Sequence, residues 1–197
     1  MLIKRIFDVL AALAGLLLLA PLLLLIAVWV KLDSTGPVFF RQERVGQHGV
    51  LFRIFKFRTM TVGTEKQGQI TIGRDARITG VGHRLRHYKL DELPQLLNVL
   101  IGDMSLVGPR PEVPKYVALY TNAQRELVLS VKPGITDLAS ITYRDENRLL
   151  GESADPERTY IEEVMPVKLR FYEEYVRQRS FALDVRIIFM TIGKLIR

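Results

Sequence analysis

The pattern of apolar and polar positions divides the chain into an apolar N-terminal segment and a mixed remainder. Val9 to Val30 contains no charged side chain, and its length is close to the roughly 20 residues that a membrane-spanning helix needs. This run is longer than the apolar core of about 7–15 residues in a cleaved secretory signal, and no small-residue cleavage site follows it. We therefore predict that residues 1–33 form a membrane-inserted helix that is retained in the protein.

Pro21 lies in the middle of this segment, where a proline removes a backbone hydrogen bond and clashes with the preceding turn, so we expect a bend. Lys4 and Arg5 precede the apolar run and Lys31 follows it, so the positive-inside tendency gives no clear orientation. A re-entrant helix that bends at Pro21 and returns to the same face satisfies both observations. A kinked single-pass helix is the alternative.

Residues 34–197 have mixed patterns, which predict a cytosolic domain of the α/β (α+β) class. Val38–Arg41 and Val50–Met60 are rich in β-branched and aromatic residues, with Gln47-His48-Gly49 between them. They predict a small antiparallel β-hairpin. Residues 61–82 contain several glycines and no apolar period, which favours a loop.

The remainder is predicted to be mainly helical. Leucines at 90, 93, 96, 97 and 100 form a helical stripe that Gly102 ends. Further helices are expected over Glu112–Val131, from Asp155-Pro156 onward, over Pro166–Gln178 and over Phe181–Ile196, with residues 135–150 irregular or extended. Aromatic and basic side chains mix in the last two helices, which favours amphipathic helices at a membrane interface. Packing of those helices onto the core is the alternative.

Charge is distributed unevenly along the chain. The net charge is +7, yet residues 1–90 hold 14 lysines and arginines against 5 aspartates and glutamates. A basic first half indicates an anionic partner such as a nucleic acid, lipid headgroups or a phosphorylated substrate. The chain has no cysteine, which excludes disulfides and thiolate metal sites.

The candidate chemistry lies at Asp91-Glu92, which follows the cationic run Arg84-Leu85-Arg86-His87-Tyr88-Lys89. The pair is predicted to open a helix, with Pro94 in its first turn. A helix N-terminus favours negative charge and binds phosphate, so Asp91 is expected to stay ionised and nucleophilic. Carboxylates also bind Mg²⁺ together with substrate phosphates. The alternative is structural: Asp91 caps the helix and Glu92 complements its dipole.

A longer stretch, KLDELPQLLNVLIGDMSLVGPRPE at residues 89–112, resembles the signature of the monotopic bacterial phosphoglycosyl transferases. The likeness extends over nearly the whole chain in order. It includes Lys4-Arg5-Ile6-Phe7-Asp8, FRQERVG at 40–46, FKFRTM at 55–60, KPGIT at 132–136 and SFALDVRII at 180–188.

The resemblance implies an enzyme that transfers a phosphosugar from a UDP-sugar to polyprenyl phosphate. Asp91 is the implied nucleophile, which attacks the β-phosphate, expels UMP and carries the phosphosugar before polyprenyl phosphate takes it in a ping-pong cycle. Glu92 assists by holding Mg²⁺ with Asp91 or by handling a proton. Basic positions around the diphosphate are matched by Lys56, Arg86 and Arg144, with Arg58 and Arg110 as further phosphate contacts.

The resemblance also implies a location at the bacterial inner membrane, with membrane lipids as partners and the catalytic domain facing the cytoplasm. It points to the small catalytic form that starts lipid-linked glycan assembly. The role of Asp184, the choice of UDP-sugar, the glycan pathway and a homodimeric state are left open. Departures from the family pattern are Ala20 before the proline, Lys89 before the acidic pair, and Asp137-Leu138-Ala139-Ser140 after KPGIT.

Three rival functions are distinguishable from this one. A nucleic-acid-binding protein accounts for the basic half but not for the acidic pair, and no recognised reader motif is present, so no nucleic-acid partner is expected. A non-catalytic membrane scaffold tolerates the loss of Asp91. A conventional UDP-sugar glycosyltransferase releases UDP rather than UMP.

Overall fold

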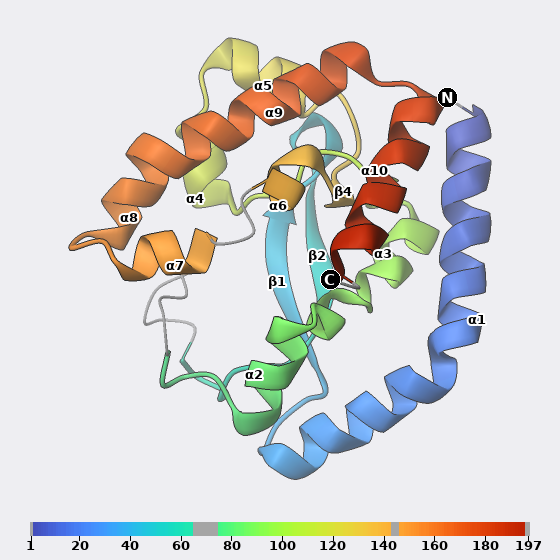
Figure 1. Cartoon of the computed structure of the whole chain (residues 1–197), viewed down its shortest axis with the longest axis vertical. Coiled ribbons are helices and arrows are strands. Elements are labelled where there is room, and N and C mark those ends of the chain that lie inside the picture. Colours follow the sequence, from blue (N-terminus) through green and yellow to red (C-terminus); the bar gives the residue numbers. More distant parts are fainter. Residues whose placement is uncertain (1, 65–74, 143–145, 196–197) are drawn as a thin grey trace.

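The fold is known from a computed structural model that describes residues 2–64, 75–142 and 146–195. A central hairpin is surrounded by helices, and the bent helix α1 forms one border of the molecule (Figure 1). In chain order the elements are α1 (Leu2–Asp33), β1 (Phe39–Val45), β2 (Leu51–Phe57), α2 (Gly80–His87), α3 (Gln95–Ile101), β3 (Ser105–Val107), α4 (Pro114–Val117), α5 (Asn122–Val128), β4 (Gly134–Thr136), α6 (Leu138–Thr142), α7 (Glu146–Gly151), α8 (Pro156–Thr159), α9 (Met165–Gln178) and α10 (Phe181–Leu195), with short 3₁₀ turns at η1 (Gln47–Gly49) and η3 (Leu90–Glu92) and a π-helix at η4 (Tyr160–Val164). The predicted mixed α/β class is confirmed.

The predicted hairpin is confirmed, and its first strand is longer than expected. β1 and β2 pair antiparallel from Phe39 opposite Phe57 to Val45 opposite Leu51. His48 and Gly49 both adopt positive φ angles, of 57° and 79°, and make the tight reversal between the strands. β1 extends to Val45 because the alternation of exposed and partly buried side chains continues to that residue, which is only 6% exposed.

A second sheet was not predicted. β3 and β4 pair in parallel, with Ser105 opposite Gly134 and Val107 opposite Thr136. The strands approach so closely that a Cβ atom on Gly134 would lie 2.1 Å from the amide nitrogen of Gly108. The expectation that residues 135–150 are irregular or extended agrees with β4 but is wrong for α6 and α7, which are helical. Asp137 begins α6 by accepting a hydrogen bond of 2.9 Å from the amide of Ser140.

The single helix predicted over Glu112–Val131 is wrong, because the segment forms the two short helices α4 and α5. Thr121 adopts an extended conformation, with φ −61° and ψ 159°, and its hydroxyl caps the amide of Gln124. The Gln124 side chain returns a bond to the Thr121 amide, which completes a capping box. This local signal starts a new helix within the apolar pattern.

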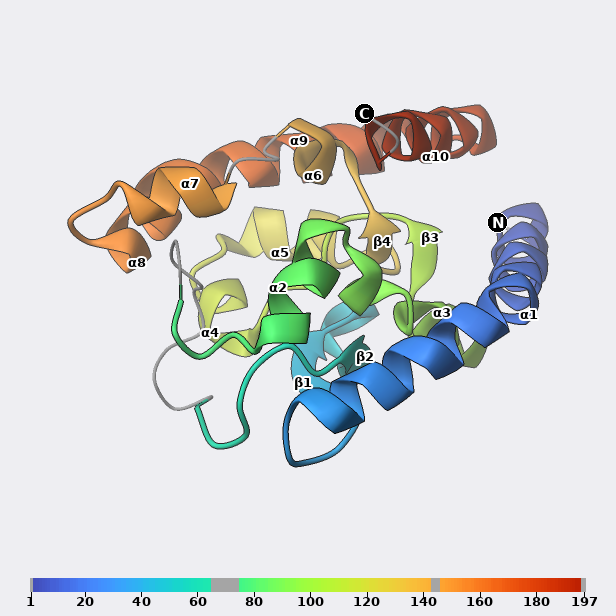
Figure 2. The same ribbon diagram turned by 60° about the horizontal axis from the view of Figure 1, so that its bottom comes forward.

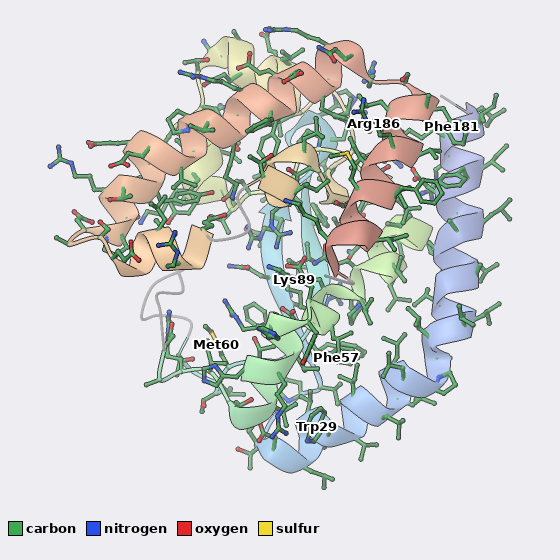
Figure 3. The ribbon with its side chains drawn as sticks, in the orientation of Figure 1. Trp29, Phe57, Met60, Lys89, Phe181 and Arg186 are labelled. Atoms are coloured by element: carbon green, nitrogen blue, oxygen red, sulfur yellow. The ribbon has the colours of Figure 1, made fainter. Side chains whose placement is uncertain are left out.

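The C-terminal helices follow their predicted boundaries, and Asp155 caps α8 with Pro156 in its first turn, as expected. α9 buries Leu169, Tyr172, Tyr175 and Val176, so packing onto the core is the correct alternative for that helix. α10 leaves Phe189 70% and Ile192 47% exposed. α10 lies next to the start of α1, where the ring of Phe181 meets Phe7 edge-on at 5.2 Å (Figure 3).

α1 is one continuous helix that contains Pro21, and it bends near its middle in both ribbon views (Figures 1 and 2). Its length and composition are sufficient to cross a membrane, and only 11% of its most apolar window is buried within the protein. Most of its leucines are therefore left without protein partners, among them Leu17, Leu18 and Leu24.

Both ends of α1 are fastened to the same domain. Near the start, Arg5 donates to the carbonyl of Val99 at 2.6 Å, and buried Asp8 accepts from the Ser105 hydroxyl at 2.8 Å. At the far end, the Asp33 carboxylate accepts from the amide of Val81 at 3.1 Å. The bent helix thus contacts the same domain near both of its ends (Figure 1).

Candidate active site

The acidic pair lies in the short turn η3, between α2 and α3. Lys89 adopts a left-handed conformation with φ 57°, and this residue redirects the chain from α2 into the turn (Figure 3). The prediction that the pair opens the helix needs a correction of several residues, because α3 begins only at Gln95. Pro94, which lacks an N–H, lies immediately before α3. Asp91 and Glu92 lie further back, in the 3₁₀ turn that precedes Pro94.

Glu92 is held by two cations from other elements. Lys56 of β2 donates to its Oε1 at 2.8 Å, and Arg110 grips both carboxylate oxygens, with Nη1 to Oε2 at 3.1 Å. Burial alone would raise the pKa of Glu92, but Arg110 and Lys56 outweigh it and hold that pKa well below the usual range. The ionised form of Glu92 is therefore favoured, and both of its oxygens are engaged.

Asp91 is in the opposite situation. Its carboxylate is 7% exposed, and Oδ1 is buried without a hydrogen-bond partner among the described residues. Burial raises the pKa of Asp91, while the nearby charges of Lys56 and Arg86 act to lower it. We expected ionisation to be favoured at a helix N-terminus, yet burial dominates instead. An unpaired, desolvated carboxylate oxygen is a strong nucleophile once it is ionised.

The remaining predicted cations fall into three groups. Arg86 is half-buried at the end of α2 and close enough to lower the pKa of Asp91, so it joins Lys56 and Arg110 around the pair. Arg144 lies outside the described residues. Arg58 does not join the cluster.

Arg58 corrects the expectation of a phosphate contact. It is 4% exposed, and its guanidinium donates to the carbonyls of Ser34 at 2.7 Å and Val30 at 3.2 Å, and to that of Thr35. These carbonyls belong to the C-terminal end of α1 and the turn after it, where carbonyl groups lack helical partners. Arg58, which lies two residues after Lys56, therefore caps the end of α1.

Sequence reasoning also left two acidic residues unassigned, and both have structural contacts. Asp184 accepts bonds from Lys4 and from Tyr175, the latter at 2.7 Å, so it joins α1 to α9 and α10. Glu112 is 8% exposed and accepts a bond of 2.7 Å from the hydroxyl of Tyr160. Glu112 lies two residues after Arg110, at the end of the segment GPRPE. Nothing in the sequence pattern singles it out, whereas its burial in the structure does.

The donor set fits a divalent cation that is shared with substrate. Within residues 2–64, 75–142 and 146–195, no three histidine, cysteine or acidic side chains gather into a protein-only metal site. Asp91 nevertheless offers a free oxygen, whereas the oxygens of Glu92 are taken by cations. Mg²⁺ commonly binds one or two carboxylates together with substrate phosphates, and Asp91 suits that arrangement better than Glu92 does.

This chain is similar in sequence to known sugar transferases. A family model described as bacterial sugar transferase matches residues 1–197. A UDP-N-acetylgalactosamine-undecaprenyl-phosphate N-acetylgalactosaminephosphotransferase of Aeromonas hydrophila is 42% identical over 96% of this chain and 43% of its own length. A UDP-glucose:undecaprenyl-phosphate glucose-1-phosphate transferase of Escherichia coli K12 is 41% identical over 98% of this chain and 40% of its own length.

A third relative is closer in size. The sugar transferase EpsL of Bacillus subtilis, itself described as uncharacterized, is 39% identical over 100% of this chain and 88% of its own length. The chain thus spans less than half of the two functionally named relatives and most of EpsL. Those two relatives are about equally similar to this chain but are named for different sugars, so the likeness does not select a sugar.

Proposed function

Because the chain belongs to the bacterial sugar transferase family, we propose that it transfers a phosphosugar from a UDP-sugar to undecaprenyl phosphate. The observation that carries this proposal is the contrast within the acidic pair. Asp91 has a buried oxygen without a hydrogen-bond partner among the described residues, and the adjacent Glu92 is neutralised by Lys56 and Arg110. One carboxylate is thereby free to react, and the other holds two cations beside it.

In the first half-reaction, Asp91 attacks the β-phosphorus of the UDP-sugar. A bond forms between the carboxylate oxygen and the β-phosphorus, and the bond from that phosphorus to the bridging oxygen breaks. UMP leaves, and the phosphosugar stays on Asp91 as an acyl phosphate. Lys56, Arg86 and Arg110 supply the positive charge that the reaction needs, since phosphoryl transfer depends mainly on positioning and on charge neutralisation.

In the second half-reaction, an oxygen of undecaprenyl phosphate attacks the same phosphorus. The bond to Asp91 breaks, so the free carboxylate is restored and a lipid diphosphate sugar is formed. Glu92 remains ionised throughout, because Arg110 and Lys56 depress its pKa. Its role is to hold those two cations in place beside the reacting phosphorus, and its carboxylate does not need to bind the metal directly.

Mg²⁺, when bound by Asp91 and the substrate phosphates, would offset the charge of the diphosphate and of the departing UMP. Without Mg²⁺, the cations of the protein alone would have to neutralise two carboxylates and a diphosphate. We infer that Mg²⁺ is required for the donor half-reaction.

The membrane placement is part of the proposal. The exposed apolar surface of α1 and the fastening of both its ends to the catalytic domain support a re-entrant helix over residues 1–33. The active site then lies at headgroup level on the cytoplasmic side, where the phosphate of a lipid-anchored acceptor is found. The apolar face of α10 fits the same interface.

Nucleotide analysis tests the overall reaction. The wild-type protein in nanodiscs, given undecaprenyl phosphate, Mg²⁺ and a panel of UDP-sugars, should release UMP with at least one donor. Asp91→Asn should release none, and Glu126→Gln, an exposed acidic residue of α5, should match the wild type. Release of UDP would favour a conventional glycosyltransferase, and the absence of turnover with every donor would favour the scaffold.

A further inference from the structure

Glu112 is a buried carboxylate that the two half-reactions do not use. It ends the loop Gly108–Glu112, here called the arginine loop because it carries Arg110. Its Oε1 accepts a hydrogen bond of 2.7 Å from the Tyr160 hydroxyl, and its Oε2 lies 3.9 Å from Nη1 of Arg44. A buried charge is costly unless it is paired and hydrogen-bonded. Oε2 also accepts from the amide of Val113 at 3.3 Å, whereas Tyr160 is the donor to Oε1.

Arg44, at the end of β1, connects Glu112 to the backbone of the arginine loop. Its Nη1 donates to the carbonyl of Pro111 at 3.0 Å, and its Nη2 donates to Gln42 at 2.7 Å. The next residue, Val45, donates its amide to the carbonyl of Glu112 at 2.9 Å. β1 therefore holds the loop at the two residues that immediately follow Arg110.

Tyr160 binds the other oxygen of the Glu112 carboxylate. It is 4% exposed and is the first residue of the π-helix η4. π-Helical turns are rare and are often found at functional sites. The ring centroids of Tyr160 and Tyr116 lie 4.8 Å apart. This packing holds the Tyr160 hydroxyl toward Glu112. The π-helical turn thus places the Tyr160 hydroxyl against the carboxylate of Glu112. Glu112 lies two residues from Arg110, which binds Glu92.

We propose that Tyr160, Glu112 and Arg44 are positioning residues that fix Arg110 for its two-oxygen grip on Glu92, an inference that rests on the proposed function. Without the Tyr160 hydroxyl, Oε1 of Glu112 loses its donor, and Arg44, whose Nη1 already lies 3.9 Å from Oε2, is expected to move toward the carboxylate. Arg44 then leaves the carbonyl of Pro111. The arginine loop loosens, and Arg110 no longer meets Glu92 in a fixed geometry.

The first test removes one atom. Tyr160→Phe should lower the single-turnover rate of phosphosugar transfer onto Asp91 roughly tenfold, a typical cost of losing an outer hydrogen-bond partner. Tyr116→Phe, which keeps the ring beside Tyr160, should have the wild-type rate. A wild-type rate in Tyr160→Phe would overturn the inference. An equal loss in both variants would also overturn it, because the effect would then belong to general packing.

A double-mutant cycle separates positioning from general stability. Arg110→Lys already removes the two-oxygen grip, so adding Tyr160→Phe to it should lower the rate further by less than about twofold if Tyr160 acts through Arg110. A full tenfold further loss in that background would show that Tyr160 acts by another route and would overturn the proposal.

Amide hydrogen exchange gives a readout that does not depend on activity. Exchange at Arg110 and Glu112 should be faster in Tyr160→Phe than in the wild type and unchanged in Tyr116→Phe. If the phenylalanine variant does not fold, Glu112→Gln serves instead, since it keeps the side-chain shape but loses the charge that pairs with Arg44. Unchanged exchange in the folded variant overturns the inference. A wild type that forms no phosphosugar adduct overturns the proposed function alone.

Discussion

Asp91 and Glu92 are adjacent carboxylates in very different electrostatic surroundings. Arg110 and Lys56 surround Glu92, whereas an oxygen of Asp91 is buried and has no donor among the described residues. Paired acidic groups whose surroundings separate their pKa values commonly perform different tasks. Here the ionised member holds cations, and the member with the raised pKa is the proposed nucleophile.

The pH dependence of the donor half-reaction follows from Asp91. Its carboxylate must be ionised to attack, and burial raises its pKa, so the rate should rise with pH through a midpoint above the ordinary aspartate value of about 4. Lys56→Met should move that midpoint to higher pH, because the charge of Lys56 lowers the pKa of Asp91.

The control for this prediction is Arg53→Met, an exposed cation on the same strand, which should leave the midpoint in place. The measurement is the single-turnover rate of adduct formation from pH 4 to 8, a range that covers roughly the values at which perturbed carboxylates titrate. A midpoint in Lys56→Met that stays constant or moves to lower pH would contradict the assignment of Asp91.

At the residue scale, sequence reasoning located the acidic pair, and the family resemblance added Lys56, Arg86 and Arg110, but neither predicted that Lys56 and Arg110 bind Glu92. Asp91-Glu92 stood out because a cationic run precedes it, whereas the contacts of Lys56 and Arg110 with Glu92 join positions far apart in the chain. Motif membership could not separate Lys56 from Arg58, two residues later. Side chains two residues apart on a strand point to the same face. Arg58 nevertheless has different partners from Lys56, because it lies just beyond β2, where the end of α1 offers free carbonyl groups.

At the scale of elements, α1 depends on polar contacts at its two ends. Lys4, Arg5 and Asp8 fasten its start, and Asp33 and Arg58 fasten its end. These groups lie outside the apolar run, where hydrogen bonds to the catalytic domain are available. These polar contacts act together with Ala12, Ile26 and Val30 of the apolar run, which are buried against the domain.

Arg58→Met tests the corrected role of that residue. The loss of its bonds to the end of α1 should destabilise the protein by about 1–3 kcal/mol, and thermal unfolding should show a midpoint several degrees lower. The KM for the UDP-sugar should stay close to that of the wild type. A large rise in KM with an unchanged midpoint would restore the phosphate-binding role and contradict the structure.

Labelling of introduced cysteines tests the re-entrant form of α1. Leu2→Cys and Leu32→Cys are suited to this because the side chains are 75% and 80% exposed and the chain has no cysteine of its own. A membrane-impermeant reagent should label both from the cytoplasmic side of sealed vesicles and neither from the other side. Labelling of the two positions from opposite sides would establish a single-pass helix.

Elements with a strong local signal were predictable, and elements fixed by distant contacts were not. The hairpin, the cap of α8 and the two C-terminal helices follow from local patterns. The parallel pair of β3 and β4 has only three residues in each strand and depends on the approach of Gly108 to Gly134. The break at Thr121 was encoded in its capping box with Gln124, but the apolar pattern across it suggested one helix.

For the molecule as a whole, one domain binds both ends of a bent apolar helix (Figure 2). The same domain brings Lys56 of β2 and Arg110 to the acidic pair. This arrangement suits a reaction between a water-soluble nucleotide sugar and a lipid phosphate. In the proposed reaction, the donor would enter from solvent and the acceptor would remain in the membrane beside α1. A covalent intermediate allows the two substrates to react in turn, without meeting in one site.

The most direct test is intact-protein mass spectrometry of the nanodisc-held protein with UDP-sugars and Mg²⁺ but without undecaprenyl phosphate. The account predicts a mass gain of one phosphosugar, which is absent in Asp91→Asn and disappears when undecaprenyl phosphate is added. An adduct that persists in Asp91→Asn, or turnover without any adduct on the wild-type protein, would contradict the assignment of Asp91 as the nucleophile.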